Sequence, residues 1–245
     1  MIRKIRKDNR RAQGHVEMII SFVIFIGFVS VLLFSLNPLT DKRINFTLLE
    51  ITESKLMENW TISYFVGSLS FDNPPSVSTG CIEISNLIGL NNNILVQDKD
   101  GKFGFGEING GNIKINKSGT NGRFYKIYSS DNFKQTDLSA CSSSPISEAD
   151  YEFGPVNSYS NVLYENLILF IDKYNQDYES LKQEIGLQND FAVFVYTQNS
   201  GSRELIANAS IFVPKTNEII ARDIPVLAIN KTAGKTDLLV NIRVW

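Results

Sequence analysis

Histidine is almost absent from this chain of 245 residues, which contains only His15. A Ser-His-Asp or Cys-His catalytic unit is therefore excluded from the body of the protein, as is a zinc site built on histidine. Only two cysteines are present, and they cannot supply a thiolate metal site by themselves. Enzymes that use only carboxylates are not excluded, but no motif favours one. We therefore expect no enzyme activity, no cofactor and no resident metal.

Charge is scarce overall and unevenly distributed. The formal net charge is −2 at pH 7, so no global basic field favours a nucleic-acid partner. Six Lys and Arg residues lie within the first eleven positions, and none lies between residues 12 and 36. Residues 37–245 carry 18 Lys and Arg against 24 Asp and Glu. A basic N-terminus therefore precedes an uncharged stretch and a mildly acidic body.

Residues 18–36 form a run of nineteen uncharged, mainly apolar residues. As a helix this run would span about 28 Å, close to the hydrocarbon thickness of a bilayer. It is longer than the apolar core of a secretory signal peptide, and Asn37-Pro38-Leu39-Thr40 is not a typical cleavage site. The preceding cations favour a cytoplasmic N-terminus. The sequence thus predicts a single-pass protein of the cell membrane, with residues 37–245 extracellular.

The boundary before the apolar run has its own pattern, Arg10-Arg11-Ala12-Gln13-Gly14-His15-Val16-Glu17. This pattern resembles the class III signal sequence of archaeal type IV pilin-like proteins. The resemblance implies that a prepilin peptidase cuts between Ala12 and Gln13, which makes Glu17 the fifth mature residue. It departs from the commonest pattern at Ala12, where glycine is usual, and at His15, where a small hydroxyl residue is frequent. A cut after Gly14 is the alternative, and it would make Glu17 third.

The resemblance also implies a function. In such proteins the α-amine freed by cleavage can neutralise the equivalent glutamate of a neighbouring subunit, and an unpaired carboxylate at that depth is costly. We expect a pilin-like structural subunit that assembles through its apolar helix into a surface filament or a membrane-associated complex. Its partners would be the membrane, the prepilin peptidase, and copies of itself or related pilin-like subunits. The alternative is an uncleaved single-pass surface binding protein or adhesin, in which Glu17 merely lies at the headgroup level.

The expected fold class is α+β, with one transmembrane helix followed by an extracellular head of antiparallel strands and one long amphipathic helix. Apolar residues recur at spacings of three and four from Tyr159 to Ile185, which predicts that helix. Short runs of β-forming residues and turn dipeptides predict the strands. The expected division is a cleavable basic leader (1–12), a transmembrane and stalk helix (13–60), a β-rich part (61–157), and a part with the long helix and further strands (158–245).

Three further features of the head invite a structural or chemical interpretation. Cys81 and Cys141 would form a disulfide in an oxidising exterior. Residues 96–107 imitate a calcium-binding loop, but Val96 replaces its first ligand, so a hairpin turn is favoured. Five Asn-x-Ser/Thr sequons permit glycosylation; they begin at Asn45, Asn59, Asn116, Asn208 and Asn230.

Overall fold

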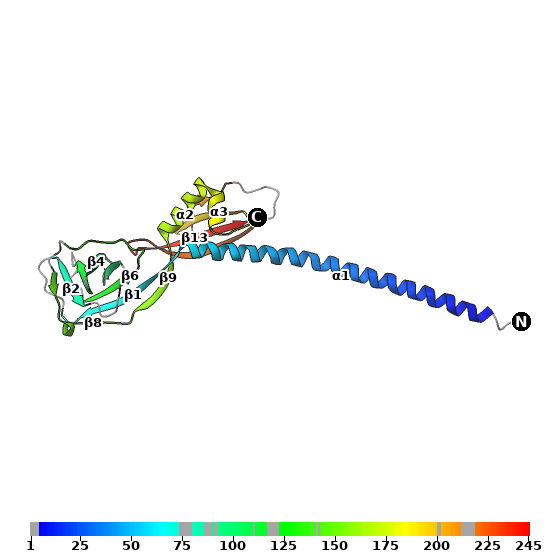
Figure 1. The fold of residues 1–245 in the computed structure, drawn as a ribbon, viewed down its shortest axis with the longest axis horizontal. Helices are drawn as coiled ribbons and strands as arrows, with labels where there is room; N and C mark the ends of the chain where they lie inside the picture. The colour runs from blue at the N-terminus through cyan, green and yellow to red at the C-terminus, as the bar shows by residue number, and fades with distance from the viewer. Residues whose placement is uncertain are drawn as a thin grey trace. The chain divides into compact units, whose positions relative to one another are not determined.

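The computed structural model describes residues 5–73, 80–85, 90, 93–109, 111–116, 123–139, 141, 143–199, 202–211 and 219–245 (Figure 1). The chain divides into two compact units, residues Met1–Ile51 and Thr52–Trp245. The second is called the C-terminal unit below. The fold is α+β, with one apolar N-terminal helix and a large sheet in which antiparallel pairing predominates. This confirms the coarse architecture expected from the sequence.

Helix α1 (Ile5–Trp60) is one continuous helix of 56 residues. It begins eight residues before the expected start at residue 13, and it ends at the expected position. Its last nine residues, Thr52–Trp60, belong to the C-terminal unit. There Leu56 and Trp60 are buried, and the Trp60 and Phe170 rings meet edge to face, with their centroids 5.3 Å apart. The end of α1 is therefore part of the core of this unit.

Thirteen strands form a single sheet. Their order is β11-β10-β13-β12-β9-β1-β6-β3-β4-β5-β2-β7, with β8 also paired to β1. Only the pairs β12–β9 and β2–β7 are parallel among the described strands. The bounds are β1 (Thr61–Phe71), β2 (Cys81–Ser85), β3 (Ile94–Asp98), β4 (Phe103–Asn109), β5 (Asn112–Asn116), β6 (Phe124–Ser129), β7 (Ser143–Pro145), β8 (Tyr151–Phe153), β9 (Asn157–Leu163), β10 (Phe191–Asn199), β11 (Ser202–Ala209), β12 (Ile220–Ile229) and β13 (Lys235–Val244).

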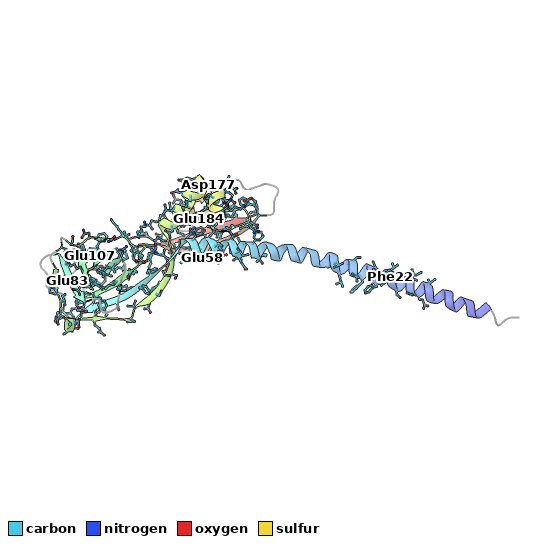
Figure 2. All side chains as sticks on the ribbon, viewed as in Figure 1. Phe22, Glu58, Glu83, Glu107, Asp177 and Glu184 are labelled. Atoms are coloured by element: carbon cyan, nitrogen blue, oxygen red, sulfur yellow. A yellow bond between two sulfur atoms is a disulfide. The ribbon has the colours of Figure 1, made fainter. Side chains whose placement is uncertain are left out.

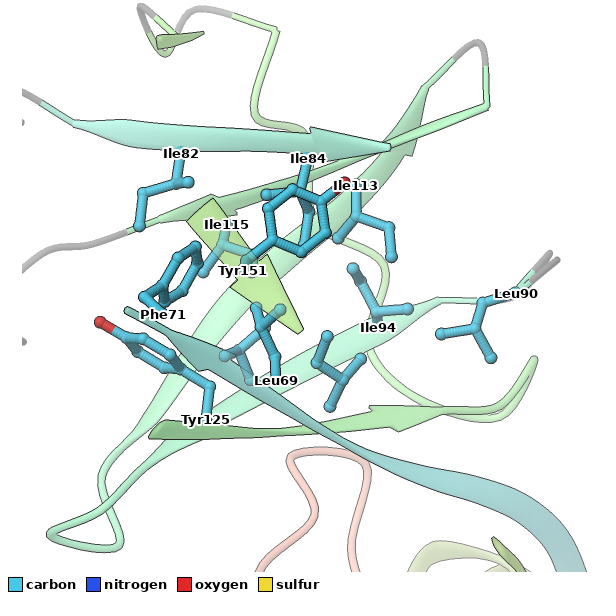
Figure 3. Close-up of a cluster of buried hydrophobic side chains, with 12 residues drawn as sticks. Leu69, Phe71, Ile82, Ile84, Leu90, Ile94, Ile113, Ile115, Tyr125 and Tyr151 are labelled. Atoms are coloured by element: carbon cyan, nitrogen blue, oxygen red, sulfur yellow. The ribbon is translucent and has the colours of Figure 1, made fainter. Parts of the chain in front are cut away.

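Strand β1 contributes to hydrophobic clusters on both faces of the sheet. Because successive side chains of a strand point to opposite faces, Ile62 and Tyr64 lie on one face, and Leu69 and Phe71 lie on the other. Ile62 and Tyr64 pack in one buried cluster, and Leu69 and Phe71 pack in a second. Figure 3 shows the second cluster, in which Leu69 and Phe71 lie with isoleucines of β2 and β5. Strand β1 therefore contributes core side chains on both faces of the sheet.

The long helix expected from Tyr159 to Ile185 is not present. Residues 157–163 form strand β9 instead, and two shorter helices follow, α2 (Tyr164–Gln176) and α3 (Tyr178–Glu184). Strand β9 pairs with residues 61–66 of β1, so pairing across the sheet overrides the helical periodicity there. Asp177 separates the helices because its side chain accepts a hydrogen bond from the Ser180 N–H, as an N-cap of α3. The expected division between residues 157 and 158 therefore falls inside β9.

Helices α2 and α3 lie together beside the C-terminal strands (Figure 1). Leu167, Phe170 and Tyr174 of α2 are buried, and Tyr174 donates a hydrogen bond of 2.5 Å to the carbonyl of Phe191 in β10. Burial raises the pKa of Tyr174 to about 12. Burying one large apolar side chain of this kind contributes about 1.5–3 kcal/mol. The apolar stripe inferred from the sequence is thus a core stripe, divided between two helices.

Candidate functional site: an exposed apolar helix and an aromatic sheet face

The apolar part of α1 is exposed at nearly every residue of the range that the structure describes. Residues Val16–Leu33 form a helical segment that is long and apolar enough to cross a membrane, and none of it is buried. The Phe22 side chain, labelled in Figure 2, is 64% exposed. A helix that is apolar on all sides is normally buried in a core or a membrane. This segment, called the apolar segment below, therefore has the length and the composition of a helix that crosses a membrane.

The expected processing and assembly residues lie at the start of this segment. Ala12 and Gln13 are in the helical backbone of α1, but their side chains fall outside the described part of the chain. Glu17 is the second residue of the apolar segment, and its side chain is exposed. The structure therefore places a carboxylate at one end of an uncovered apolar helix. Cleavage and assembly remain predictions.

Cys81 and Cys141 form a disulfide, with their Cα atoms 5.9 Å apart. This confirms the pairing expected from the sequence. Cys81 begins β2 and is completely buried, while Cys141 precedes the short strand β7, which pairs with β2. The bond joins residues that are 60 positions apart within the β-rich part. Disulfides persist in oxidising compartments, and the extracellular position of the C-terminal unit stays a prediction.

The sequons differ in how available their asparagines are. Asn59, at the end of α1, and Asn208, in the outermost strand β11, are exposed. Asn116 is half-buried, and the side chain of Asn45 lies outside the described part of α1. The Asn230 side-chain oxygen accepts hydrogen bonds from the Thr232 N–H, the Thr232 hydroxyl and the Gly234 N–H. Asn230 therefore holds the turn between β12 and β13, which makes its side chain less available than that of Asn59 or Asn208.

The sequence that imitates a calcium loop is a hairpin turn between β3 and β4. The Asp98 carboxylate accepts hydrogen bonds from the backbone N–H groups of Asp100 and Lys102, at 2.9 and 2.8 Å. Gly101 adopts a φ of 81°, which glycine tolerates without strain. These bonds use the side-chain oxygen that a cation would require. The hairpin favoured by the sequence is therefore the correct interpretation.

Other carboxylates also support the fold individually. Glu83 accepts a hydrogen bond from the Asn112 side chain, and Glu107 accepts one from the backbone N–H of Leu138. Figure 2 shows these two glutamates in the β-rich part and Asp177 with Glu184 at the helices. Among the described residues, no three His, Cys, Asp or Glu side chains are grouped as a metal site would require.

A groove lies on the open face of β9, β1, β6 and β3, and the sequence did not predict it. It consists of two adjoining hollows of about 520 and 280 Å³, which share Ser68 and Lys126. Register places Tyr64 beside Tyr159, Ser68 beside Lys126, and Ser70 between Phe124 and Glu152. Small residues therefore lie in the middle of the floor, with aromatic rings towards both ends. We call this surface the aromatic groove.

Hydrogen bonds and stacking hold one wall of the aromatic groove in place. The Tyr128 hydroxyl donates to the Gln97 side-chain oxygen at 3.0 Å, and Gln97 donates in turn to the Gly101 carbonyl at 3.2 Å. The Tyr64 ring stacks against Tyr128 and Tyr159, with centroids 6.3 and 5.8 Å away. Burial raises the pKa values of Tyr64 and Tyr128, so both hydroxyls stay protonated at neutral pH. The wall is thus neutral and preorganised.

Sequence reasoning missed this groove for a specific reason. The alternation of β6 does reveal that Phe124, Lys126 and Tyr128 share one face. The spacing of apolar residues, however, predicts a helix at Tyr159, and its place beside Tyr64 follows only from the register of β9 with β1. A pairing between strands that lie far apart in the chain leaves no signal in a single sequence.

Comparisons with known proteins supply no identity. The chain matches no protein-family model, no curated protein and no solved structure at a significant level.

Proposed function

We propose that this chain is a pilin-like structural subunit that assembles through its apolar N-terminal helix into a surface filament or a membrane-associated complex. The observation that carries the proposal is the apolar segment Val16–Leu33, which has no buried residue and contains Glu17 near its start. Without a bilayer or neighbouring helices, its 18 mainly apolar residues would face water. Lateral packing of identical helices would cover this surface.

In this proposal the membrane holds the unprocessed chain in a single pass, with its basic end in the cytoplasm. The disulfide between Cys81 and Cys141 supports the outward position of the C-terminal unit, because such bonds persist in oxidising surroundings. An archaeal-type prepilin peptidase would remove residues 1–12 by cutting between Ala12 and Gln13. Copies of the chain, or related pilin-like subunits, would then assemble. No step requires a cofactor or a catalytic residue of the chain.

Glu17 would align the subunits. Cleavage gives Gln13 a free α-amine, and the Glu17 carboxylate of an adjacent subunit would neutralise it in surroundings of low dielectric. Removing one partner of a buried ion pair costs about 3–5 kcal/mol, because the other charge is left uncompensated. The carboxylate would therefore contribute to assembly rather than to membrane insertion.

Glu17→Ala tests this role. Processing should continue, because the peptidase would recognise the basic residues and Ala12, whereas sedimentable assemblies should be lost and membrane insertion should improve. Glu17→Gln is the matched control, since it keeps the shape of the side chain, loses the charge and should also fail to assemble. The assay follows N-terminal mass and sedimentation in the native host. Wild-type protein that is neither processed nor assembled contradicts the proposal.

That last outcome would favour the alternative, an uncleaved single-pass surface binding protein or adhesin. The aromatic groove is the observation that supports this alternative. It is a preorganised hollow, and its described residues include no set of side chains arranged for catalysis. Glycosylation would suit either function, and we propose Asn59 and Asn208 as the acceptors because both are exposed. Peptide mass spectrometry of the native protein, with Asn59→Gln and Asn208→Gln as controls, checks the assignment.

A further inference from the structure

Exposed aromatic rings are concentrated on one face of the C-terminal unit. Among the described side chains of residues 52–245, five aromatic residues are at least 37% exposed. Register places four of them on the face of the aromatic groove: Phe103, Phe105, Phe124 and Tyr159. The fifth, Phe65, lies on the other face of β1. Exposed apolar surface gathered in one place marks an interaction site, and four rings on one face form such a surface.

The middle of the groove is hollow because two of its floor residues are small. Gly154 donates a backbone hydrogen bond of 2.9 Å to the carbonyl of Ser68. A methyl group at residue 154 would lie 2.1 Å from the Ser68 hydroxyl oxygen, so only glycine fits there without a shift. Along β1 the groove extends from Tyr64 to Ser70, and these six steps of a strand correspond to about 20 Å. A chain of several units can lie in it.

The polar groups of the groove divide into two kinds. Tyr64, Tyr128 and Gln97 are engaged in hydrogen bonds of the wall. Lys126, Glu152 and Asn157, in contrast, have no hydrogen bond or ion pair through their side chains to any part of the chain that the structure describes. An ammonium, a carboxylate and an amide thus line the hollow with their bonding capacity unused by the fold. They are positioned to bind a ligand rich in donors and acceptors.

The charges that line the groove and their positions indicate which class of ligand it can bind. Lys99, Lys126 and Lys235 face Asp98 and Glu152 around the groove, so neither sign dominates and a polyanion gains little. A protein interface places its charged residues at the rim, whereas Lys126 is shared by both hollows and lies between the rings. The ligand must therefore be neutral, with apolar surface and hydrogen-bonding groups alternating over a few ångströms.

We propose that the aromatic groove binds a neutral oligosaccharide chain. A sugar ring presents a face of C–H groups, which suits the negative face of an aromatic ring, and an edge of hydroxyls that both donate and accept. Tyr159 and Phe124 stack against sugar faces, while Lys126, Glu152 and Asn157 bind hydroxyls between them. This inference does not depend on filament assembly, because a processed subunit and an uncleaved anchor present the same groove.

The test uses the full chain in lipid nanodiscs and isothermal titration with defined probes. The neutral probes are the hexasaccharides of β-1,4-glucose, β-1,4-N-acetylglucosamine and β-1,4-mannose, compared with free glucose and with a heparin hexasaccharide. At least one neutral hexasaccharide should bind with a Kd below about 1 mM, and glucose at least tenfold more weakly. Failure of all three hexasaccharides to bind, or tighter binding of heparin, overturns the proposal.

Matched variants locate the binding. Tyr159→Ala and Phe124→Ala should each weaken binding about two- to tenfold, as expected for the loss of one stacking ring. Tyr159→Phe should retain most of the affinity, because the ring remains. Phe65→Ala is the control, since that ring is 44% exposed on β1 but faces away from the groove. Equal weakening by Phe65→Ala would show that binding occurs elsewhere and would end the assignment.

Discussion

The apolar segment Val16–Leu33 and helix α2 use similar residues to opposite effect. In α2 the apolar side chains form one stripe, and Leu167 and Phe170 on that stripe are buried against the rest of the C-terminal unit. In the apolar segment they extend around the whole helix, and none of the segment is buried. Helix α2 therefore has the pattern of a helix that packs on a core with one face, whereas the apolar segment has the composition of a helix that crosses a membrane.

The largest expected effect is on the striped helix. Leu167→Asp places a carboxylate at a side chain with 0% exposure, and it should destabilise the C-terminal unit by about 3–5 kcal/mol, enough to unfold it. Leu169→Asp is the matched control, because Leu169 is 57% exposed on the same helix and should cost less than about 1 kcal/mol. Urea unfolding of the full chain in detergent, followed by near-UV circular dichroism, measures both. Equal effects would contradict the assigned helix face.

Loss of the disulfide should have the next largest effect. In the chain-entropy model, closing the loop between Cys81 and Cys141 restricts the unfolded chain by about 4 kcal/mol. Reduction, or replacement of both cysteines by serine, should lower the free energy of unfolding by up to this amount. The double variant also controls for other effects of the reducing agent, since reduction should not change the free energy of unfolding of a chain without cysteines. Two reactive thiols in unfolded, unreduced wild-type protein would contradict the bond.

A charge in the apolar segment should impair membrane insertion and leave the stability of the C-terminal unit unchanged, in contrast to Leu167→Asp. Phe22→Asp should reduce insertion into a membrane by at most about 2.5–3.5 kcal/mol, which is the cost of such a charge at the centre of a span. It should leave unfolding of the C-terminal unit unchanged, because Phe22 belongs to the other compact unit of the chain. Phe22→Leu is the control for side-chain size and should insert normally. Alkaline extraction of membranes measures insertion, and any loss of stability in the C-terminal unit would break the comparison between the two helices.

The sequence predicts most of this fold because its strands carry local signals. Strand β5 alternates in burial as its pattern of Asn112-Ile-Lys-Ile-Asn116 implies, and Gly101 marks the turn that joins β3 to β4. Helical periodicity also identified Leu167, Phe170 and Tyr174 as core residues. These features depend on residues close together in the chain, and a single sequence records them well.

The sequence-based predictions are wrong or incomplete where contacts between residues far apart in the chain determine the local structure. Tyr159 fits a helical stripe as well as a strand, and its pairing with Tyr64 settles the question. The break at Asp177 depends on one capping hydrogen bond that competes with continued helix. The aromatic groove requires β9, β1, β6, β3 and β8 in register, so neither Lys126 nor Glu152 can be recognised as its lining beforehand.

The smallest expected effect concerns a charged contact that joins α3 to the start of β10. Lys182 donates to the Asp190 carboxylate at 2.6 Å, and the Tyr178 hydroxyl donates to the same oxygen at 2.8 Å. These two bonds lower the pKa of Asp190, and the bond from Lys182 has the largest effect. Burial acts in the opposite direction and raises the pKa. A carboxyl whose pKa is lower in the folded state stabilises the fold above its unfolded pKa of about 3.9. That contribution is lost as the pH falls through the native pKa.

Asp190→Asn should therefore flatten the fall in stability below about pH 4, while changing stability at pH 7 by less than about 1 kcal/mol. The effect is small because the Asp190 side chain is 46% exposed and solvent screens its charge. Asp223, whose pKa is also lowered by its bond with Asn241, should preserve part of the acid sensitivity. Tyr178→Phe is the matched variant, since it keeps both charges and removes only the two hydrogen bonds of the hydroxyl, to the Asp190 carboxylate and from the Phe191 N–H. The stability of Tyr178→Phe should fall more steeply at low pH than that of Asp190→Asn. Urea unfolding at about pH 7, 4 and 2.5 measures the free energy of unfolding of wild type and of both variants on either side of the unfolded pKa. If the free energy of unfolding of Asp190→Asn falls with pH as steeply as that of wild type, Asp190 does not contribute to the acid sensitivity.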